Sequence, residues 1–258
     1  MSGIEIRSIA KVNLGLHIMG KLANGYHLLE TLFYPVEDLF DDVLIRRIDE
    51  LECRVLMPGF GESVPLERNL AWRAWKVLRD HYPDRVGGVE IEIRKRIPAG
   101  AGLGGGSSNA GAVFKGLNTL MELGLGEEEL AGLAEPLGAD VPFFIYGKPL
   151  YATGIGNRFE VLPVDLSAYR LEVRTLPVHS GTAEAYGGLD LESIRHDLPL
   201  KELLVLPLPA WKEKVLNDLE PGVVGRFPQI GEAVNELYSE GAKYAAMTGS
   251  GSAVFALF

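Results

Sequence analysis

The sequence contains a single cysteine, Cys53, among 258 residues. One cysteine excludes an internal disulfide and a cysteine-based metal cluster, and it is typical of a reducing compartment. No apolar run approaches the roughly 18 residues that a transmembrane helix needs. The first residues also lack the basic and then apolar pattern of a signal peptide. We therefore expect a cytoplasmic protein with no membrane partner.

Basic residues are also few. Lys and Arg total 25 against 35 Asp and Glu, which gives a formal net charge of -10. Because clustered Lys and Arg supply the affinity for a phosphate backbone, this balance argues against a nucleic-acid partner. The hydrophobic fraction of 47% and the charged fraction of 23% are ordinary for a globular enzyme with one large domain or two modest ones.

Hydrophobic periodicity predicts a mixed α+β protein. Alternation predicts strands over residues 4–18, 27–33, 42–48, 52–56 and 89–97, with a hairpin turn at Asn24-Gly25. Helical spacing predicts one helix from Asn69 and another after residue 109 that ends near Gly124. A change of composition over residues 161–167 suggests two domains, 1–162 and 163–258. The second part is predicted to hold a strand over 169–176, helical stretches near Thr182, near Leu200 and over 209–217, a helix over 228–240 and a glycine-broken hairpin over 244–258.

The most informative segment is PAGAGLGGGSSN, residues 98–109, which leads directly into a helix. Glycines expose backbone N–H groups, and a helix N-terminus adds unpaired donors and partial positive charge, so the segment predicts a phosphate site. A flexible surface turn is the ordinary structural explanation, but such a turn would not run straight into a well-formed helix.

Two familiar phosphate loops fit the segment poorly. Gly100, Gly102 and Gly105 satisfy the G-x-G-x-x-G pattern, but the strand before them alternates and is not the buried parallel strand of a dinucleotide site. A Walker A loop needs a Lys-Ser/Thr pair, which is missing. The remaining interpretation is a kinase loop of another type, in which Ser107 and Ser108 offer hydroxyls to phosphate or to a metal ion. Any catalytic cation must then come from elsewhere in the chain.

Two charged residues are candidates for the chemistry. Lys11 and Asn13 lie on the same face of the first strand, where neighbouring side chains are about 7 Å apart. A lone strand lysine is more often simply solvated. Asp140 stands in the apolar run LGADVPFF, where it could equally be a helix N-cap. A carboxylate in apolar surroundings favours a cationic partner, so pairing with Lys11 is chemically reasonable.

A third glycine turn, MTGSGS, occupies residues 247–252. It is either a simple hairpin turn or a second set of backbone amides. Such amides would brace the first loop or line the nucleotide site.

Three segments, residues 10–13, 98–110 and 248–253, resemble in this order the motifs of the GHMP kinase superfamily. The extended loop over 102–109 and the segments 24–33 and 137–143 are similar to the branch that acts on a methylerythritol carrying a cytidine diphosphate group. The resemblance implies a ribosomal protein S5 domain 2-like N-terminal domain and a ferredoxin-like C-terminal domain. Family members usually continue past the third motif, so this C-terminal domain is expected to lack the last helix and strand.

The resemblance also implies a reaction, namely ATP-dependent phosphorylation of the 2-hydroxyl of that small-molecule substrate in non-mevalonate isoprenoid biosynthesis, with Mg²⁺ as cofactor. Asp140 would take the hydroxyl proton while Lys11 keeps Asp140 ionised and stabilises developing charge. The other implied site residues are Pro98, Ala99, Gly100, Ala101, Gly102, Leu103, Gly104, Gly105, Gly106, Ser107 and Ser108 for the ATP phosphates; Asn69 and Lys95 near the adenosine; Tyr26, His27 and Tyr186 for the cytidine; Asn13 for the methylerythritol hydroxyls; and Gly249, Ser250 and Gly251 in the third motif.

Alternatives remain open at this point. The chain could be a GHMP kinase of the homoserine or mevalonate type, or a nucleotide-binding regulator without turnover, and a dehydrogenase is a weaker third possibility. Cross-strand packing beside the hairpin is the ordinary structural explanation for Tyr26 and His27. The sequence predicts neither the metal ligands nor the oligomeric state.

Overall fold

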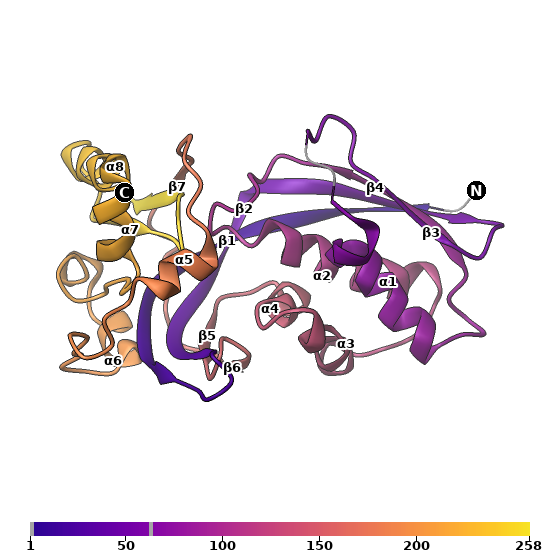
Figure 1. Ribbon diagram of the computed structural model, residues 1–258, viewed down its shortest axis with the longest axis horizontal. Helices are drawn as coiled ribbons and strands as arrows, with labels where there is room; N and C mark the ends of the chain where they lie inside the picture. The colour runs from indigo at the N-terminus through magenta and orange to yellow at the C-terminus, as the bar shows by residue number, and fades with distance from the viewer. Residues whose placement is uncertain (1–2, 62–63) are drawn as a thin grey trace. The chain divides into compact units, whose positions relative to one another are not determined.

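The computed structural model describes residues 3–61 and 64–258 (Figure 1). The chain forms two compact units. The first comprises the residues up to Ala10, Pro35–Ala99 and Gly104–Lys148, and the second comprises Lys11–Tyr34, Gly100–Leu103 and Pro149–Phe258. Strands β1 (Gly3–Lys21) and β2 (His27–Ile48) contribute to both units. The units are thus divided differently from the domains 1–162 and 163–258, which stay a prediction.

In the sheet of the first unit, the strand before the glycine loop has one antiparallel and one parallel neighbour. β4 (Gly88–Arg94) pairs antiparallel with β2, with Val43 opposite Ile93 and Ile45 opposite Ile91. On its other side β4 pairs parallel with β3 (Cys53–Leu56). The alternating apolar residues of β2 and β4 are buried, because successive strand side chains point to opposite faces of the sheet.

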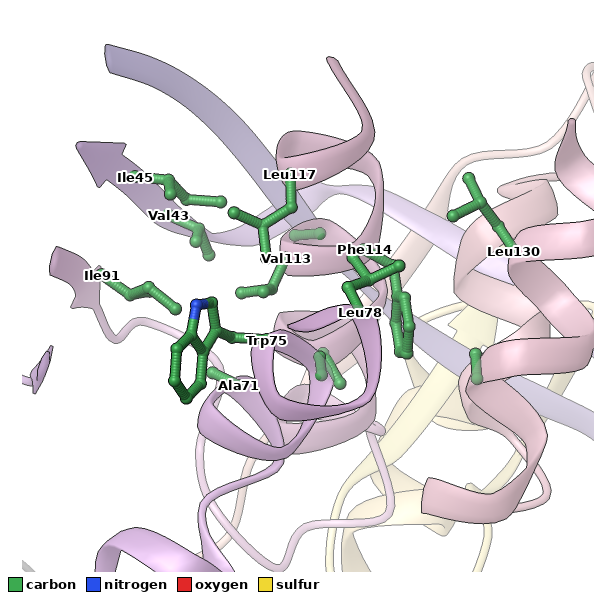
Figure 2. Close-up of a cluster of buried hydrophobic side chains, with 14 of the residues drawn as sticks. Val43, Ile45, Ala71, Trp75, Leu78, Ile91, Val113, Phe114, Leu117 and Leu130 are labelled. Atoms are coloured by element: carbon green, nitrogen blue, oxygen red, sulfur yellow. The ribbon is translucent and has the colours of Figure 1, made fainter. Parts of the chain in front are cut away.

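Helices pack on this sheet and enclose the core of the first unit (Figure 2). They are α1 (Leu70–His81), α2 (Gly105–Leu120), α3 (Glu127–Ala134) and α4 (Val141–Tyr146), with short 3₁₀ turns at Leu66–Arg68 and Glu135–Leu137. Asn69 starts α1 as its N-cap, as predicted, because its side-chain oxygen accepts from the Ala71 amide at 2.9 Å. The core side chains labelled in Figure 2 are Val43, Ile45, Ala71, Trp75, Leu78, Ile91, Val113, Phe114, Leu117 and Leu130.

The second unit holds the hairpin end of β1 and β2. β5 (Leu150–Thr153) pairs antiparallel with β2 at residues 31–33, and β6 (Arg158–Glu160) pairs with β5. A separate antiparallel sheet has the order β7-β9-β8, with bounds Leu171–Arg174, Val254–Leu257 and Tyr244–Met247. The helices of this unit are α5 (Thr182–Gly187), α6 (Leu200–Leu204), α7 (Glu220–Arg226) and α8 (Pro228–Ser239), with a 3₁₀ turn at Leu208–Ala210.

Two sequence predictions need correction. The predicted strands 27–33 and 42–48 are one strand, β2, in which Pro35 lies between the stretch that pairs with β5 and the stretch that pairs with β4. The predicted helix over 209–217 is wrong. Instead of a continuous helix, this stretch holds the 3₁₀ turn at Leu208–Ala210 and further hydrogen-bonded turns. Its end pairs with β1, because the Leu16 amide donates to the Leu216 carbonyl and the Asp218 amide donates to the Leu16 carbonyl, at 2.8 and 2.9 Å. That backbone pairing outweighs the helical spacing of its apolar residues.

Helix α7 was not predicted, because Pro221, Gly222 and Gly225 hide its helical character. None of the helices in the part of the chain that the structure describes is long and apolar enough to cross a membrane.

Candidate active site

The glycine loop ends in the N-terminus of α2. Gly104 is the N-cap residue and adopts a left-handed conformation with φ of +71°, which glycine accommodates without strain. The first amides of a helix have no partner within it, and here they belong to Gly105, Gly106 and Ser107. Gly106 is exposed and the other two are half-buried. This end of α2 therefore offers backbone donors and partial positive charge to an anion, as the sequence predicts.

The two serines of the loop differ in their surroundings. The Ser108 hydroxyl is buried and donates to the Ile9 carbonyl at 2.6 Å, and it lies 2.7 Å from the Ser8 hydroxyl, which donates to it. It thus fastens α2 to β1. The Ser107 hydroxyl is half-buried and donates to Oδ1 of Asp140 at 2.8 Å. Of the two side chains, only that of Ser107 is placed to meet a ligand.

Asp140 stands at the N-cap position of α4, but its side chain makes no capping hydrogen bond. It accepts from Ser107 instead, and it is half-buried. The N-cap role that the sequence left open is therefore not the role of this carboxylate. The carboxylate faces the phosphate loop.

Lys11 is buried, with 5% of its surface exposed, so it is not a solvated strand lysine. Its Nζ donates to Oδ1 of Asn13 and to the Gly102 carbonyl, both at 2.5 Å, and it lies 5.6 Å from the centre of the Phe33 ring. The predicted neighbours Lys11 and Asn13 do meet. The ammonium group is fixed against the phosphate loop within the second unit.

The third glycine motif braces the same part of the loop. A Cβ atom on Gly102, whose φ is +76°, would lie 2.1 Å from the Thr248 carbonyl oxygen. The Ala253 amide donates to Ala101 at 3.1 Å, and the buried Thr248 hydroxyl accepts from the Asn13 amide at 3.0 Å. Gly249, Ser250 and Gly251 form the turn between these contacts. Of the two functional interpretations of this motif, the structure supports bracing.

Two residues behind this turn were missed by sequence reasoning. The buried Asn217 side chain donates to the carbonyls of Met247 and Gly249, both at 2.9 Å. Glu220 accepts from the Met247 amide at 2.8 Å, and burial raises the pKa of its carboxyl group. Both lie about thirty residues before the turn, in a segment with no recognisable motif.

The predicted cytidine residues lie at the β1–β2 hairpin and on α5. The His27 and Tyr186 rings are 4.9 Å apart between centroids and inclined by 32°. Partial burial and the nearby Lys21 lower the pKa of His27, which favours a neutral imidazole. Tyr26 is 59% exposed beside the turn residue Gly25. An exposed aromatic ring and an imidazole are thus adjacent in sequence, and a second aromatic ring contacts the imidazole.

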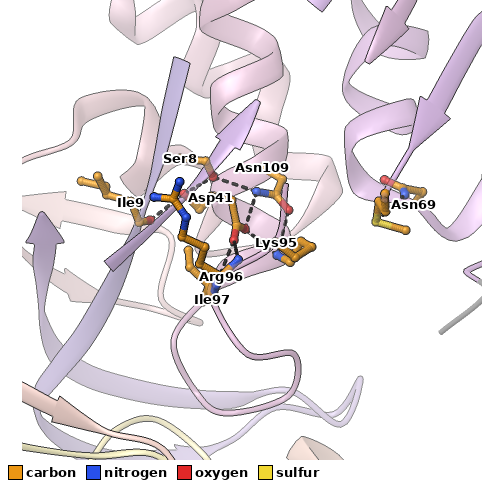
Figure 3. A network of polar contacts seen from close by, with 10 residues as sticks. Ser8, Ile9, Asp41, Asn69, Lys95, Arg96, Ile97 and Asn109 are labelled. Carbon is orange, nitrogen blue, oxygen red and sulfur yellow. Dashed lines mark hydrogen bonds and ion pairs between the residues drawn. The ribbon is translucent and has the colours of Figure 1, made fainter. Parts of the chain in front are cut away.

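The two predicted adenosine residues are separated within the first unit. Asn69 caps α1 and lies apart from Lys95 in Figure 3. Lys95 instead joins a buried network around Asp41, a residue that sequence reasoning missed. A signal existed, because Asp41 has the same parity as the buried Val43 and Ile45 in β2 and so places a carboxylate on the apolar face.

Among residues 3–61 and 64–258, no group of three or more His, Cys, Asp or Glu side chains could hold a metal ion by itself. This does not conflict with Mg²⁺ binding, since the ion is usually held by one or two carboxylates together with substrate phosphates. The Asp140 carboxylate and the Ser107 hydroxyl provide oxygen atoms of the right kind.

Comparison with known proteins agrees with this architecture. The family model described as GHMP kinases N terminal domain matches residues 69–148, and the one described as GHMP kinases C terminal matches residues 201–258. Two relatives named 4-diphosphocytidyl-2-C-methyl-D-erythritol kinase are similar over 96% of this chain. The one from Azobacteroides pseudotrichonymphae is 39% identical over 91% of its own length, and the one from Porphyromonas gingivalis is 40% identical over 90%.

Solved structures show the same likeness. A crystal structure of 4-(cytidine 5'-diphospho)-2C-methyl-D-erythritol kinase is similar with a TM-score of 0.81 and 33% identity, over 98% of this chain and 90% of that one. Homoserine kinase from Cytophaga hutchinsonii has a TM-score of 0.74 at 18% identity, covering 100% of this chain and 85% of that one, which shows a shared fold. The chain is therefore an ATP-dependent phosphotransferase of the GHMP kinase family, and it belongs to the branch whose curated members are named 4-diphosphocytidyl-2-C-methyl-D-erythritol kinase.

Proposed function

We propose that this enzyme transfers the γ-phosphoryl group of ATP to the 2-hydroxyl of 4-diphosphocytidyl-2-C-methyl-D-erythritol, a step of non-mevalonate isoprenoid biosynthesis. The names of relatives at about 40% identity support the choice of acceptor. One structural observation supports the proposed phosphoryl transfer. Within a single loop, Gly102 accepts from Lys11 and Ser107 donates to Asp140. The amides at the start of α2 make this loop suitable for binding phosphate. The same loop thus contacts both proposed catalytic residues.

Asp140 is the proposed general base. Its carboxylate takes the proton from the acceptor hydroxyl as the oxygen forms a bond to the γ-phosphorus, while the bond from that phosphorus to the bridging oxygen breaks and ADP leaves. The contact with Ser107 supports this role, since it keeps the carboxylate beside the first turn of α2. Lys11 is proposed to stabilise the negative charge that develops during the transfer. It suits this role because Asn13 and Gly102 hold its ammonium group rigidly.

The ATP phosphates are proposed to bind to the segment 98–108, mainly through the first amides of α2 and the Ser107 hydroxyl. Mg²⁺, when bound with ATP, neutralises phosphate charge. The Ser107 hydroxyl is an oxygen atom of this loop that would help to hold the ion. Asn69 and Lys95 remain the candidates for the adenosine side of the nucleotide.

The cytidine is proposed to stack on Tyr26 and to meet the edge of His27, with Tyr186 as the second aromatic surface. The exposure of Tyr26 and the contact between His27 and Tyr186 support this assignment. Asn13 is proposed to meet the methylerythritol hydroxyls. It is buried and already bonds to Lys11, to Thr31 and to Thr248, so positioning Lys11 is an additional part of its role.

The test is to offer ATP with 4-diphosphocytidyl-2-C-methyl-D-erythritol, homoserine and mevalonate in turn and to measure ADP release. We expect turnover with the cytidyl substrate alone. Preference for homoserine or mevalonate would favour another GHMP kinase, a candidate supported only by the shared fold. ATP binding without ADP release from any acceptor would indicate a non-catalytic regulator, and a negative nicotinamide titration would exclude a dehydrogenase. A cytoplasmic location remains a prediction.

A further inference from the structure

The carboxylate of Asp41 connects the two ends of the phosphate loop within the first unit (Figure 3). Its Oδ1 accepts from the amides of Arg96 and Ile97, at 2.7 and 2.9 Å, just before the loop begins. Its Oδ2 accepts from the side chains of Asn109 and Lys95, at 2.8 and 2.5 Å. Asn109 follows the loop, on the first turns of α2. One buried side chain therefore holds the segments on both sides of residues 98–108.

The network continues from Asn109 into β1. The Asn109 side chain donates to the Ser8 hydroxyl at 2.8 Å, and the Ser8 hydroxyl donates to Ser108, which donates to the Ile9 carbonyl. Asp41 is 0% exposed and Asn109 is 5% exposed. The beginning of α2 is therefore fixed to two strands by polar contacts shielded from water, where hydrogen bonds are stronger than at the surface.

Lys95 is the member of the network that reaches the surface, with 12% of its side chain exposed against 0% for Asp41. Its Nζ donates to Asp41 and, at 3.1 Å, to Oδ1 of Asn109. A Cβ atom built on Gly105 would lie 3.3 Å from this Nζ. The ammonium group therefore sits over the first residue of α2 with the carboxylate behind it. An ATP molecule at this helix end would meet the Lys95 ammonium group as well as the first amides of α2.

We propose that Asp41 is a positioning residue for ATP, which fixes the Lys95 ammonium over the first turn of α2 and closes the ends of the phosphate loop. The inference rests on the proposed binding of ATP to this loop. Only a carboxylate suits the position, because all four groups that contact it are donors. An asparagine would turn an NH₂ group toward two donors in either orientation of its amide.

The test is Asp41→Asn in the full chain. For this variant, calorimetry gives the dissociation constant of a non-hydrolysable ATP analogue, and steady-state kinetics give the KM for each substrate. We expect weaker analogue binding and a higher KM for ATP, by on the order of tenfold, because a charged partner is lost from a buried network. The KM for the cytidyl acceptor should stay within about twofold. A merely structural role would lower the active fraction, and hence kcat, without moving the KM for ATP.

Asp42→Asn is the matched control. Asp42 is the next residue of β2 and pairs with the exposed guanidinium of Arg96 at 2.6 Å rather than with Lys95. Its loss should leave analogue binding unchanged. If Asp41→Asn does not fold, Asn109→Ala tests whether the network positions ATP. This variant keeps the ion pair and removes the link to α2, and we expect about threefold weaker analogue binding.

Unchanged analogue binding in the folded Asp41→Asn chain, or in Asn109→Ala when the first variant does not fold, would overturn the inference. Equal weakening in Asp42→Asn would do the same. The proposed function fails separately. A wild-type chain that does not phosphorylate the cytidyl substrate contradicts the function, while the analogue titrations still decide the role of Asp41.

Discussion

The Ser107 hydroxyl donates a 2.8 Å hydrogen bond to Oδ1 of Asp140, which joins the first turn of α2 to the residue before α4. The two residues are thirty-three positions apart, and each was a candidate for a different reason, one for its glycine loop and the other for its apolar surroundings. Their contact places a carboxylate at the end of α2 that is proposed to receive phosphate.

This contact predicts the effect of Asp140→Asn. The variant keeps the shape of the side chain and can still accept from Ser107, so binding of an ATP analogue should change by less than about threefold. It removes the general base, so kcat should fall by roughly 10²- to 10⁴-fold. Fixed-time assays of ADP release measure kcat, and calorimetric titration measures the binding of the analogue. A fully active variant would remove Asp140 from the mechanism.

Tyr26→Ala should weaken binding of the acceptor and not of ATP. The 59% exposed ring is proposed to stack on cytosine, and loss of such a stack costs about 1–3 kcal/mol. The KM for the cytidyl substrate should therefore rise about 5- to 150-fold, with the KM for ATP unchanged. Leu22→Ala is a suitable control, because Leu22 is also an exposed apolar side chain of this hairpin. An equal effect of both substitutions would indicate that only the shape of the hairpin matters.

Gly102→Ala should destabilise the second unit. The new Cβ would lie 2.1 Å from the Thr248 carbonyl oxygen, and φ of +76° is strained for alanine, so we expect a loss of roughly 2–4 kcal/mol. Gly106→Ala is the matched control in the same loop. Its Cβ would meet only the Leu70 side chain at 3.7 Å, and the residue is helical. Urea unfolding compares the two variants, and equal stability would contradict the close packing of the two glycine motifs.

His17 should make the protein sensitive to acid. It is 1% exposed, and its ring stacks on His196 at 3.8 Å. Burial, and then repulsion from His196, lowers the pKa of His17 from 6.5 to about 4, although Asp218 and Glu30 act in the opposite direction. Because the unfolded chain binds the proton more readily, stability is complete above about pH 6.5 and is lost as the pH falls toward 4.

The free energy of unfolding should drop by roughly 2–3 kcal/mol across this range on account of His17. His17→Phe keeps a flat ring against His196 but cannot take up a proton. Urea midpoints measured between pH 7 and pH 4 should therefore fall less steeply in the variant than in the wild type. Parallel pH profiles of the wild type and the variant would show that the pKa of His17 is the same in the folded and the unfolded chain.

Much of the architecture could be predicted from local patterns. Alternation located β1, β3 and β4, Asn24-Gly25 located the hairpin, and Asn69 located the start of α1. The prediction failed where long-range pairing decided the conformation. Residues 216–218 pair with β1 although a helical stretch was predicted over 209–217, and β2 continues through Pro35.

The candidate site shows the same division. The glycine loop and Asp140 could be singled out because each breaks the pattern around it. Lys11 became a candidate because the glycine loop has no lysine of its own. Asp41, Asn217 and Thr248 could not be assigned a role, since their partners lie between 30 and 235 residues away in sequence. A local pattern can show that a polar side chain stands on an apolar face, as for Asp41, but it does not show which distant group the side chain bonds.

The sequence by itself determined the glycine loop for which phosphate binding is proposed, because glycine content and a following helix are local properties that act through the backbone. It also determined the kinase family, through motifs kept in order along the chain. Only the tertiary structure decided which side chains serve the loop. It buried the Ser108 hydroxyl, turned Ser107 toward Asp140, fixed Lys11 against Gly102 and set Asp41 across the two ends of the loop. The physical reason is that burial and hydrogen bonding depend on which distant segments pack together, and folding alone brings those segments into contact.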